Sequence, residues 1–318
     1  MSATQHRRRA VVALGGNAIT KSDEEGTVDQ DYANLESSLD CVANLVQNGY
    51  ELVLTHGNGP QIGNQMVRVE LAGGEAPLLP LDVMGADIQG GLGYMIERVL
   101  RNKLRRRGLV PQVCCMLTMI TVDPDDPSLE NPTKFVGRFY SEVEAEQLQQ
   151  SRDWKMREDS GRGWRRVVAS PVPIGIVQRH ELSTLLNSGS IVISGGGGGI
   201  PVCRNERGDL IGVEGVIDKD LSSAKIALEL DASELIILTA VDRVRLFFGT
   251  PREREIPNMT VAEARQYLAE GQFPAGSMGP KVDAACRFIE GGGGRVLITD
   301  ARHLDAALNG ESGTWITI

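Results

Sequence analysis

The feature that most constrains this 318-residue sequence is a repeated order of short apolar segment, glycine turn and amphipathic segment. Three turns carry their glycines directly after an apolar segment: Gly15-Gly16 after Ala10–Leu14, Gly57-Asn58-Gly59 after Glu51–Leu54, and Gly195–Gly199 after Ser190–Ser194. Strands that alternate with helices form a mainly parallel sheet that is covered on both faces. The sequence therefore predicts an α/β fold in which ligands bind beyond the carboxyl ends of the strands.

The other apolar positions extend this alternation along the chain, with one interruption. Their spacing predicts helices over 31–47, 60–71 and 84–107, and a strand over 110–119. After the glycine run we expect helices over 220–230, 261–269, 280–290 and 303–308, and strands over 234–239, 295–299 and 313–317. Between residues 121 and 165, Asp, Pro, Glu and Arg dominate and the alternation stops. We expect a single domain over 1–318, with residues 121–165 inserted as a small protruding subdomain.

Composition and charge argue against several classes of protein. The net charge is −9 and the pI about 5.1, whereas a general nucleic-acid binder needs a basic surface. No apolar run is long enough for a signal peptide or a membrane span. The five Cys are scattered without a C-x-x-C motif, which indicates reduced thiols in the cytoplasm. The four His are scattered as well, so we expect no metal-binding residues.

The three glycine turns suit the binding of anions. Without a Cβ atom, glycine lets backbone N–H groups approach a phosphate, and a helix N-terminus adds partial positive charge. One glycine turn on its own needs no ligand to explain it, because glycines often simply end a strand. A run of five glycines is costly in chain entropy, so close approach to a ligand explains it better. We expect the three turns together to hold a phosphate and a small carboxylate-like group.

Two familiar phosphate-binding motifs are nearly present but incomplete. A P-loop has Gly before Lys-Ser, whereas Thr20 precedes Lys21-Ser22 in this sequence. A dinucleotide-binding turn has the pattern G-x-G-x-x-G, and the segment from Gly57 to Gly63 is one residue too long for it. A dehydrogenase therefore stays only as an alternative, which nicotinamide fluorescence would reveal.

Two lysines beside predicted helix starts are candidates for binding a transferred phosphoryl group. Such a transfer needs positive charge on the moving group, and an acceptor that is already an anion needs no general base. Lys219 precedes a helix that Asp218 or Asp220 would cap. Lys281 follows Pro280 in the first turn of another helix, where a cation opposes the helix dipole. This unfavourable placement suggests that an anion lies nearby.

Short segments in a fixed order carry a further signal. They run through nearly the whole chain: Ala13–Ala18, Thr55–Gln61, Pro80–Asp82, Asn131–Lys134, Phe139–Glu142, Glu158–Gly163, Ser194–Pro201, Val216–Asp220, Leu238–Asp242 and Ala275–Lys281. Each segment alone is modestly specific, whereas the ordered set is highly specific. Through this set the chain resembles the carbamate kinases of the amino-acid-kinase family. Asn131–Lys134 and the insertion around it favour carbamate kinases over their relatives.

The resemblance implies a three-layer αβα sandwich, a cytoplasmic homodimer and a reaction of arginine metabolism. In that reaction ADP and carbamoyl phosphate give ATP and carbamate, with Mg²⁺ as cofactor. By the same resemblance, Lys134, Lys219 and Lys281 surround the transferred phosphoryl group, and Asp220 holds lysines in position. Lys134 taken alone would be a surface residue of the polar insertion, so only the resemblance makes it a catalytic cation.

The resemblance also divides the chain between the two substrates. Residues 1–200 would mainly bind carbamoyl phosphate or carbamate, through Gly15, Gly16, Asn17, Gly57, Asn58, Gly59, Gly196 and Gly197. Residues 201–318 would mainly bind ATP or ADP, through Thr239, Ala240, Val241, Asp242, Gly276, Ser277 and Met278.

The sequence departs from the family pattern at three places. Many amino-acid kinases carry a Lys before the first glycine pair, whereas this chain has Val11, Val12 and Ala13, so a cation must come from elsewhere. Met84 stands where a smaller residue or Cys is expected, and Arg243–Phe248 is more basic and apolar than usual. Alternative functions are a related kinase for N-acetylglutamate or aspartate, and a non-catalytic sensor of nucleotide or carbamoyl phosphate.

Overall fold

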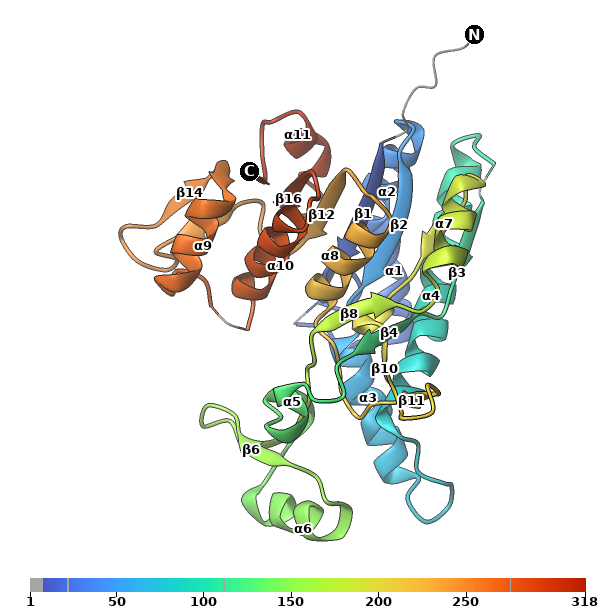
Figure 1. The fold of residues 1–318 in the computed structure, drawn as a ribbon, viewed down its shortest axis with the longest axis vertical. Coiled ribbons are helices and arrows are strands. Elements are labelled where there is room, and N and C mark those ends of the chain that lie inside the picture. The colour runs from blue at the N-terminus through green and yellow to red at the C-terminus, as the bar shows by residue number, and fades with distance from the viewer. Residues whose placement is uncertain (1–7, 22, 111, 275) are drawn as a thin grey trace.

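The computed structural model describes residues 8–21, 23–110, 112–274 and 276–318, and an eight-stranded sheet forms its centre (Figure 1). The strand order is β15 (Asn258–Thr260), β17 (Thr314–Thr317), β16 (Arg295–Thr299), β12 (Glu234–Leu238), β1 (Arg9–Leu14), β2 (Glu51–His56), β9 (Ile191–Ile193) and β3 (Val113–Cys115). Every neighbouring pair is parallel except β16 and β17. The mainly parallel sheet predicted from the sequence is confirmed.

Helices cover both faces of this sheet, because alternate side chains of a strand point to opposite sides. Val11 and Ala13 of β1 join one core with α7 (Arg179–Asn187), α8 (Lys219–Glu229), α9 (Val261–Ala269) and α10 (Met278–Glu290). Ala10, Val12 and Leu14 join the other core with α1 (Val28–Ser38), α2 (Asp40–Gln47), α3 (Gly59–Leu71), α4 (Leu81–Arg106) and α11 (Leu304–Leu308). The predicted three-layer αβα sandwich is therefore confirmed. No helix in the described ranges is long and apolar enough to cross a membrane.

A second sheet of four strands packs beside the main one and was not predicted. Its order is β11 (Leu210–Gly212), β10 (Ile200–Arg204), β4 (Met119–Val122) and β8 (Pro173–Ile176). β4 and β8 are antiparallel, with Val122 opposite Pro173, so the chain leaves and rejoins this sheet at one place.

The residues between β4 and β8 form a small unit that lies apart from the main sheet in Figure 1. Its antiparallel sheet has the order β5 (Lys134–Tyr140), β7 (Trp164–Val168) and β6 (Met156–Glu158), accompanied by α5 (Pro127–Glu130) and α6 (Glu142–Arg152). We call this unit the protruding sheet. A separate hairpin, β13 (Val244–Leu246) with β14 (Arg254–Ile256), lies beside α9.

The single strand predicted over 110–119 is wrong. β3 and β4 lie in different sheets, and residues 116–118 pass between them. Side chains of α4 hold the chain at this crossing: Glu97 accepts a hydrogen bond from the Cys115 N–H, and Gln89 bonds the backbone N–H and C=O of Thr118. A continuous apolar run carries no local signal for such a change of sheet. Pro111, within the predicted strand, lies outside the described residues.

The single helix predicted over 31–47 is also wrong, because α1 ends at Ser38 and α2 begins after Leu39. α1 starts at Val28, since the Thr27 side chain caps it and Gln30 bonds back to the Thr27 N–H. The helices predicted from 84 and 280 likewise start early, at Leu81 and Met278. The other predicted helices and strands agree with the structure within one or two residues, the usual uncertainty of element ends.

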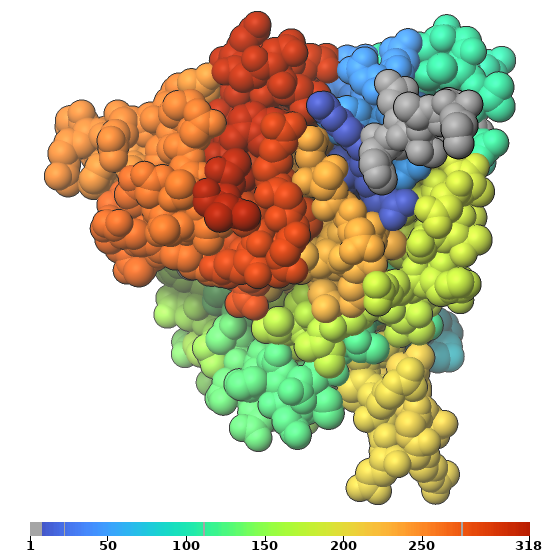
Figure 2. Space-filling view, turned by 45° about the horizontal axis from the view of Figure 1, so that its top comes forward, coloured from blue at the N-terminus to red at the C-terminus, as the bar shows by residue number. Residues whose placement is uncertain are grey.

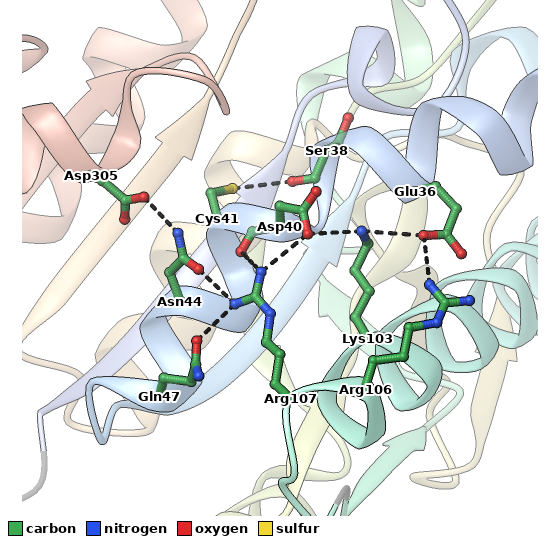
Figure 3. A network of polar contacts seen from close by, with 10 residues as sticks. All are labelled: Glu36, Ser38, Asp40, Cys41, Asn44, Gln47, Lys103, Arg106, Arg107 and Asp305. Atoms are coloured by element: carbon green, nitrogen blue, oxygen red, sulfur yellow. Dashed lines mark hydrogen bonds and ion pairs between the residues drawn. The ribbon is translucent and has the colours of Figure 1, made fainter.

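Ion pairs join the helices on the α4 face of the sheet (Figure 3). The Lys103 side chain of α4 is only 8% exposed and binds Glu36 of α1 at 3.2 Å and Asp40 of α2 at 2.9 Å. Arg107, directly after α4, binds the same Asp40 oxygen at 3.1 Å. These contacts fix the break between α1 and α2 against the end of α4.

The glycine run after β9 leaves no room for side chains. Gly195, Gly197, Gly198 and Gly199 all have positive φ. A Cβ atom on Gly196 would lie 2.2 Å from His56 Nε2, and one on Gly197 would lie 2.1 Å from Asn58 Nδ2. The run therefore packs directly against the turn that follows β2.

Replacement of Gly197 by Ala tests this packing, with Gly49 as a matched control. Gly49 has φ +80° with nothing within 4 Å of an added Cβ, whereas Gly197 has φ +65° and meets Asn58. We expect Gly49→Ala to lower the free energy of unfolding by about 1 kcal/mol through backbone strain alone. Gly197→Ala should lower it by about 3 kcal/mol, because overpacking adds to the strain. Chemical denaturation measures both values, and equal losses would contradict the packing argument.

Candidate active site

The three glycine turns meet because their strands, β1, β2 and β9, are neighbours in the sheet. An added Cβ on Gly57 would lie 3.2 Å from the backbone N of Gly16, so these two turns are in contact. The prediction that the turns share one edge of the sheet is confirmed. The expected helix soon after each turn is wrong for the glycine run, which leads through a single turn, η2 (Gly196–Gly198), into β10. Only the turn after β2 continues directly into an α-helix, α3.

A cavity of about 330 Å³ lies where these turns meet α8, α10 and β5. It brings together the three lysines singled out in the sequence, two carboxylates and parts of the glycine turns. Its lining is Gly16, Gly57, Asn58, Gly59, Pro60, Ile62, Lys134, Phe135, Val136, Arg165, Gly197, Val216, Ile217, Asp218, Lys219, Asp220 and Lys281. We call this cavity the lysine cleft.

Asp220 binds two of the lysines at once. Its Oδ1 accepts a hydrogen bond from Lys219 Nζ at 2.6 Å, and its Oδ2 accepts one from Lys281 Nζ at 3.2 Å. Asp220 is only 2% exposed, and burial alone would raise the pKa of its carboxyl. The two ammonium groups outweigh burial and hold that pKa below its ordinary value. The anion that the position of Lys281 suggested is thus present in the protein itself.

Lys134 enters the same cleft from the protruding sheet. It begins β5, and its Nζ donates a hydrogen bond to the Ile217 carbonyl at 3.1 Å. Burial lowers the pKa of Lys134, while the negative charges of Asp218 and Asp220 oppose that effect. The Lys134 side chain is therefore partly withdrawn from water and lies near two carboxylates. A bound phosphate would give it a direct anionic partner.

The start of α8 is fixed in place by its own side chains. Asp218 is the N-cap residue and accepts hydrogen bonds from the N–H groups of Asp220 and Leu221. Ser222 Oγ donates to the Gly198 carbonyl at 2.6 Å, and Ser223 Oγ lies 2.6 Å from Thr55 Oγ1. The helix that carries Lys219 is thus tied both to the glycine run and to β2.

His56 supports the turn after β2 without lining the cleft. It is buried, its Nδ1 lies 3.0 Å from the Gly57 carbonyl, and its ring packs against Gly196. Burial, together with the smaller effect of the nearby Lys219 charge, lowers the pKa of His56 to about 4 despite the opposing contact with the Gly57 carbonyl. The imidazole is therefore neutral at pH 7, and all cationic groups of the cleft are lysine and arginine.

The residues that the resemblance assigns to the nucleotide are not gathered in the lysine cleft. Thr239 and Ala240 line an adjacent cavity of about 300 Å³, together with Gly15 and Asn17. The Asp242 carboxylate binds Arg245 at 3.0 Å. Gly276 and Ser277 precede α10 and Met278 begins it, which keeps Lys281 in the first turn of the helix. Ala275, in the same sequence segment, lies outside the described residues.

Three further groups line the cleft that the sequence did not single out: the Ile217 carbonyl, the Asp218 carboxylate and the Arg165 guanidinium. Asp218 was considered only as a helix cap. Arg165 lies two residues after Glu158–Gly163, a segment that carried part of the family resemblance. This position in the sequence could have indicated that Arg165 belongs to the site.

The fit of a metal ion to this cleft depends on which carboxylate oxygens are free. No group of three or more His, Cys, Asp or Glu side chains within the described ranges is placed to hold a metal ion. Lysines bind both oxygens of Asp220, and one oxygen of Asp218 caps α8. Mg²⁺ commonly uses one or two carboxylates together with substrate phosphates and water. The second oxygen of Asp218 fits such a site, with a nucleotide supplying most of the ligands.

Comparison with known proteins adds a second line of evidence. The model of the amino acid kinase family matches residues 8–300. The carbamate kinase of Pyrococcus horikoshii is 46% identical over 312 residues, which cover 97% of this chain and 99% of that protein. The carbamate kinase-like protein YahI of Escherichia coli is 43% identical over 309 residues, covering 96% and 98%. Among solved structures, carbamate kinase from Giardia lamblia bound to AMP-PNP has a TM-score of 0.93 and 39% identity, covering 98% of this chain and 99% of that one.

Replacement of Asp220 by Asn tests the ion pairs at the centre of the cleft. Asn keeps the shape but leaves two buried ammonium groups without their anion, so we expect a loss of about 3 kcal/mol of unfolding free energy at pH 7. Asp218→Asn is the matched control, because Asn also caps helices, and it should cost less than about 1 kcal/mol. Chemical denaturation at pH 7 measures both.

The pH dependence of the same variant gives a second measurement. The folded pKa of Asp220 lies below the unfolded value, so its stabilisation is complete above the unfolded pKa of about 3.9 and disappears as pH falls through the folded pKa. The difference in unfolding free energy between wild type and Asp220→Asn should therefore shrink as the pH is lowered. A gap that is small at pH 7, or independent of pH, would contradict this account.

Proposed function

Because the chain belongs to the amino acid kinase family, we propose that it transfers a phosphoryl group reversibly between carbamoyl phosphate and ADP, giving ATP and carbamate. The observation that carries the proposal is the meeting of Lys134, Lys219 and Lys281 in one cleft lined by glycine turns. The chain is a kinase. Its similarity to carbamate kinases extends over nearly the full length of the chain, which favours this reaction over the others known in the family.

The proposed transfer proceeds in line. A terminal oxygen of ADP attacks the phosphorus of carbamoyl phosphate, the bond from phosphorus to the carbamate oxygen breaks, and carbamate leaves. In the reverse direction, carbamate attacks the terminal phosphorus of ATP. Carbamate is already an anion, so neither direction needs a general base. This agrees with a cleft whose described lining holds no histidine.

The lysines supply the charge stabilisation that such a transfer requires. Asp220 holds Lys219 and Lys281 on either side of its carboxylate, so both ammonium groups are positioned before substrate binds. Lys134 approaches from β5, and its Nζ donates to the Ile217 carbonyl in the lining of the cleft. In this proposal the three cations surround the moving phosphoryl group. The N–H groups of the glycine turns hold the remaining oxygens.

The nucleotide would extend from the Lys281 side of the cleft into the adjacent cavity lined by Thr239 and Ala240, and carbamoyl phosphate would lie against the glycine turns of residues 1–200. Thr239–Asp242 follow the end of β12, and Gly276–Met278 lead into α10, the helix that carries Lys281. Mg²⁺ bound with the nucleotide would neutralise phosphate charge, with Asp218 as the available protein oxygen.

We also propose that the protein is a cytoplasmic homodimer. Five free thiols among the described residues suit a reducing compartment. On α4, Val83 and Tyr94 are exposed by 40% and 57%, and Gly90 lies exposed between them on the same face. Ile211, 46% exposed, lies on the adjacent β10–β11 hairpin, which projects from the surface in Figure 2. A second copy of the chain would cover this apolar face.

The activity is tested by ATP formation from ADP and carbamoyl phosphate, with and without Mg²⁺. We expect Lys219→Ala and Lys281→Ala each to lower turnover about a hundredfold or more, since each removes charge stabilisation of roughly 3–4 kcal/mol. Lys225→Ala is the control, because Lys225 lies on the same helix α8 but binds Glu229 outside the cleft. It should leave turnover unchanged.

Several outcomes would contradict this assignment. Turnover near that of wild type in both cleft variants, with folding intact, would exclude the proposed roles of the lysines. ATP consumption with N-acetylglutamate or aspartate, but none with carbamate, would indicate a related kinase. Tight binding of carbamoyl phosphate without ATP formation would indicate a sensor.

The dimer surface is tested by placing a charge on it. Val83→Glu should shift the protein to the monomer, because a buried unpaired carboxylate opposes association. Val143→Glu is the control, since Val143 is 63% exposed on α6, in the protruding sheet. Light scattering coupled to gel filtration gives the masses. A wild-type monomer, or a Val83→Glu dimer as stable as wild type, would exclude this surface.

A further inference from the structure

One cation of the lysine cleft has no part in the reaction described above. Arg165 lies on β7 of the protruding sheet, and it lines the cleft together with Lys134 on the paired strand β5. Its side chain is only 22% exposed. A guanidinium drawn this far out of water needs either partners in the protein or an anionic ligand.

Two hydrogen bonds and two aromatic rings fix the position of Arg165. Its Nη1 donates to Asp159 Oδ2 at 3.1 Å, and its Nε donates to the Gly137 carbonyl at 3.2 Å. The guanidinium carbon lies 5.1 Å and 5.7 Å from the ring centres of Phe139 and Phe135. These contacts hold the plane of the guanidinium in one orientation, so a ligand would meet a group that is already positioned.

The contact with Gly137 depends on an irregularity in β5. The pairing register of β5 with β7 shifts between Val136 and Tyr140, and Gly137 adopts φ +72° within this bulge. The bulge turns the Gly137 carbonyl toward Arg165 and lets β5 approach α3, where an added Cβ on Gly63 would lie 3.7 Å from Gly137 Cα. Arg165 is thus placed by a feature of the strand as well as by its own ion pair.

Part of the guanidinium remains without a partner among the described residues. An arginine has five N–H donors, and the two bonds from Nη1 and Nε leave both donors of Nη2 unused. The lining of the cleft also has an excess of positive charge, because it contains four cationic side chains and two carboxylates. A substrate anion would satisfy both the free donors and the charge.

The neighbouring residue shows that this placement is specific to Arg165. Arg166 points to the opposite face of β7, where its Nη2 binds Glu214 at 2.5 Å and its guanidinium lies 4.4 Å from the Trp154 ring centre. Arg162 binds the same carboxylate as Arg165, Asp159 at 2.8 Å, but its side chain is 64% exposed and does not line the cleft.

We propose that Arg165 is a further catalytic residue, whose free Nη2 binds the carbamoyl oxygen of carbamoyl phosphate and the carboxylate of the carbamate product. The planar guanidinium matches a planar carboxylate, whereas the lysines suit the phosphoryl group as point charges. Negative charge grows on the carbamate oxygens as the phosphorus–oxygen bond breaks. The bond from Arg165 therefore strengthens in the transition state. This inference rests on the proposed function.

Steady-state kinetics of Arg165→Gln, with Arg162→Gln as the matched control, test the proposal. We expect Arg165→Gln to lower kcat/KM for carbamoyl phosphate by about 10- to 100-fold, as for the loss of a hydrogen bond from a charged group. The KM for ADP should change by less than about twofold, because the nucleotide lies on the other side of the cleft. Arg162→Gln should stay within about threefold of wild type in both parameters.

Arg165→Lys keeps the positive charge but loses the planar, two-pronged donor geometry of the guanidinium. Its kcat/KM for carbamoyl phosphate should lie between those of wild type and Arg165→Gln. If Arg165→Gln does not fold, Arg165→Lys decides the question by the same comparison with Arg162→Gln. Equal kinetics in the Arg165 and Arg162 variants, or an equal loss for both substrates, would overturn the inference. Absence of ATP formation by the wild type would instead overturn the proposed function itself, so the two failures are distinguishable.

Discussion

The structure depends on one buried carboxylate that faces two ammonium groups. Asp220 would be costly to bury as an isolated anion, and Lys219 and Lys281 would repel each other without it. The triad therefore joins α8 to α10 and holds two cations close together before any substrate arrives. Asp220 thus holds Lys219 and Lys281 where a substrate phosphate, which is also an anion, requires positive charge.

The sheet and the glycines then determine where this charge can act. β1, β2 and β9 are neighbours, so the turns that follow them reach the same edge as the starts of α8 and α10. Contacts such as that between Gly197 and Asn58 are closer than any side chain allows. The glycines thus bring three backbone segments near the lysines, and their N–H groups provide fixed dipoles that need no rearrangement.

The sequence predicted this architecture where periodicity and turn chemistry are local, as for α9 and β16, whose bounds match in full. It failed at β4, β8, β10 and β11, because these short strands also contain partly or fully exposed positions and lack the nearly continuous buried apolar run of β16. Lys219 and Lys281 could be singled out from their helix starts. Lys134 needed a family resemblance, and Arg165 was missed, because both approach through the pairing of β5 with β7 and the bulge at Gly137.

The antiparallel pairing of β4 with β8 has a consequence for how this architecture can vary between lineages. The chain leaves the four-stranded sheet after Val122 and returns beside it at Pro173. The residues between them are therefore an insertion whose two ends lie next to each other. The entropic cost of closing such an insertion depends only weakly on its length, so it can become longer or shorter while the four-stranded sheet stays intact. The unit that delivers Lys134 and Arg165 can therefore change in length without breaking its flanking strands, provided that Lys134 still reaches Ile217 and Arg166 still reaches Glu214.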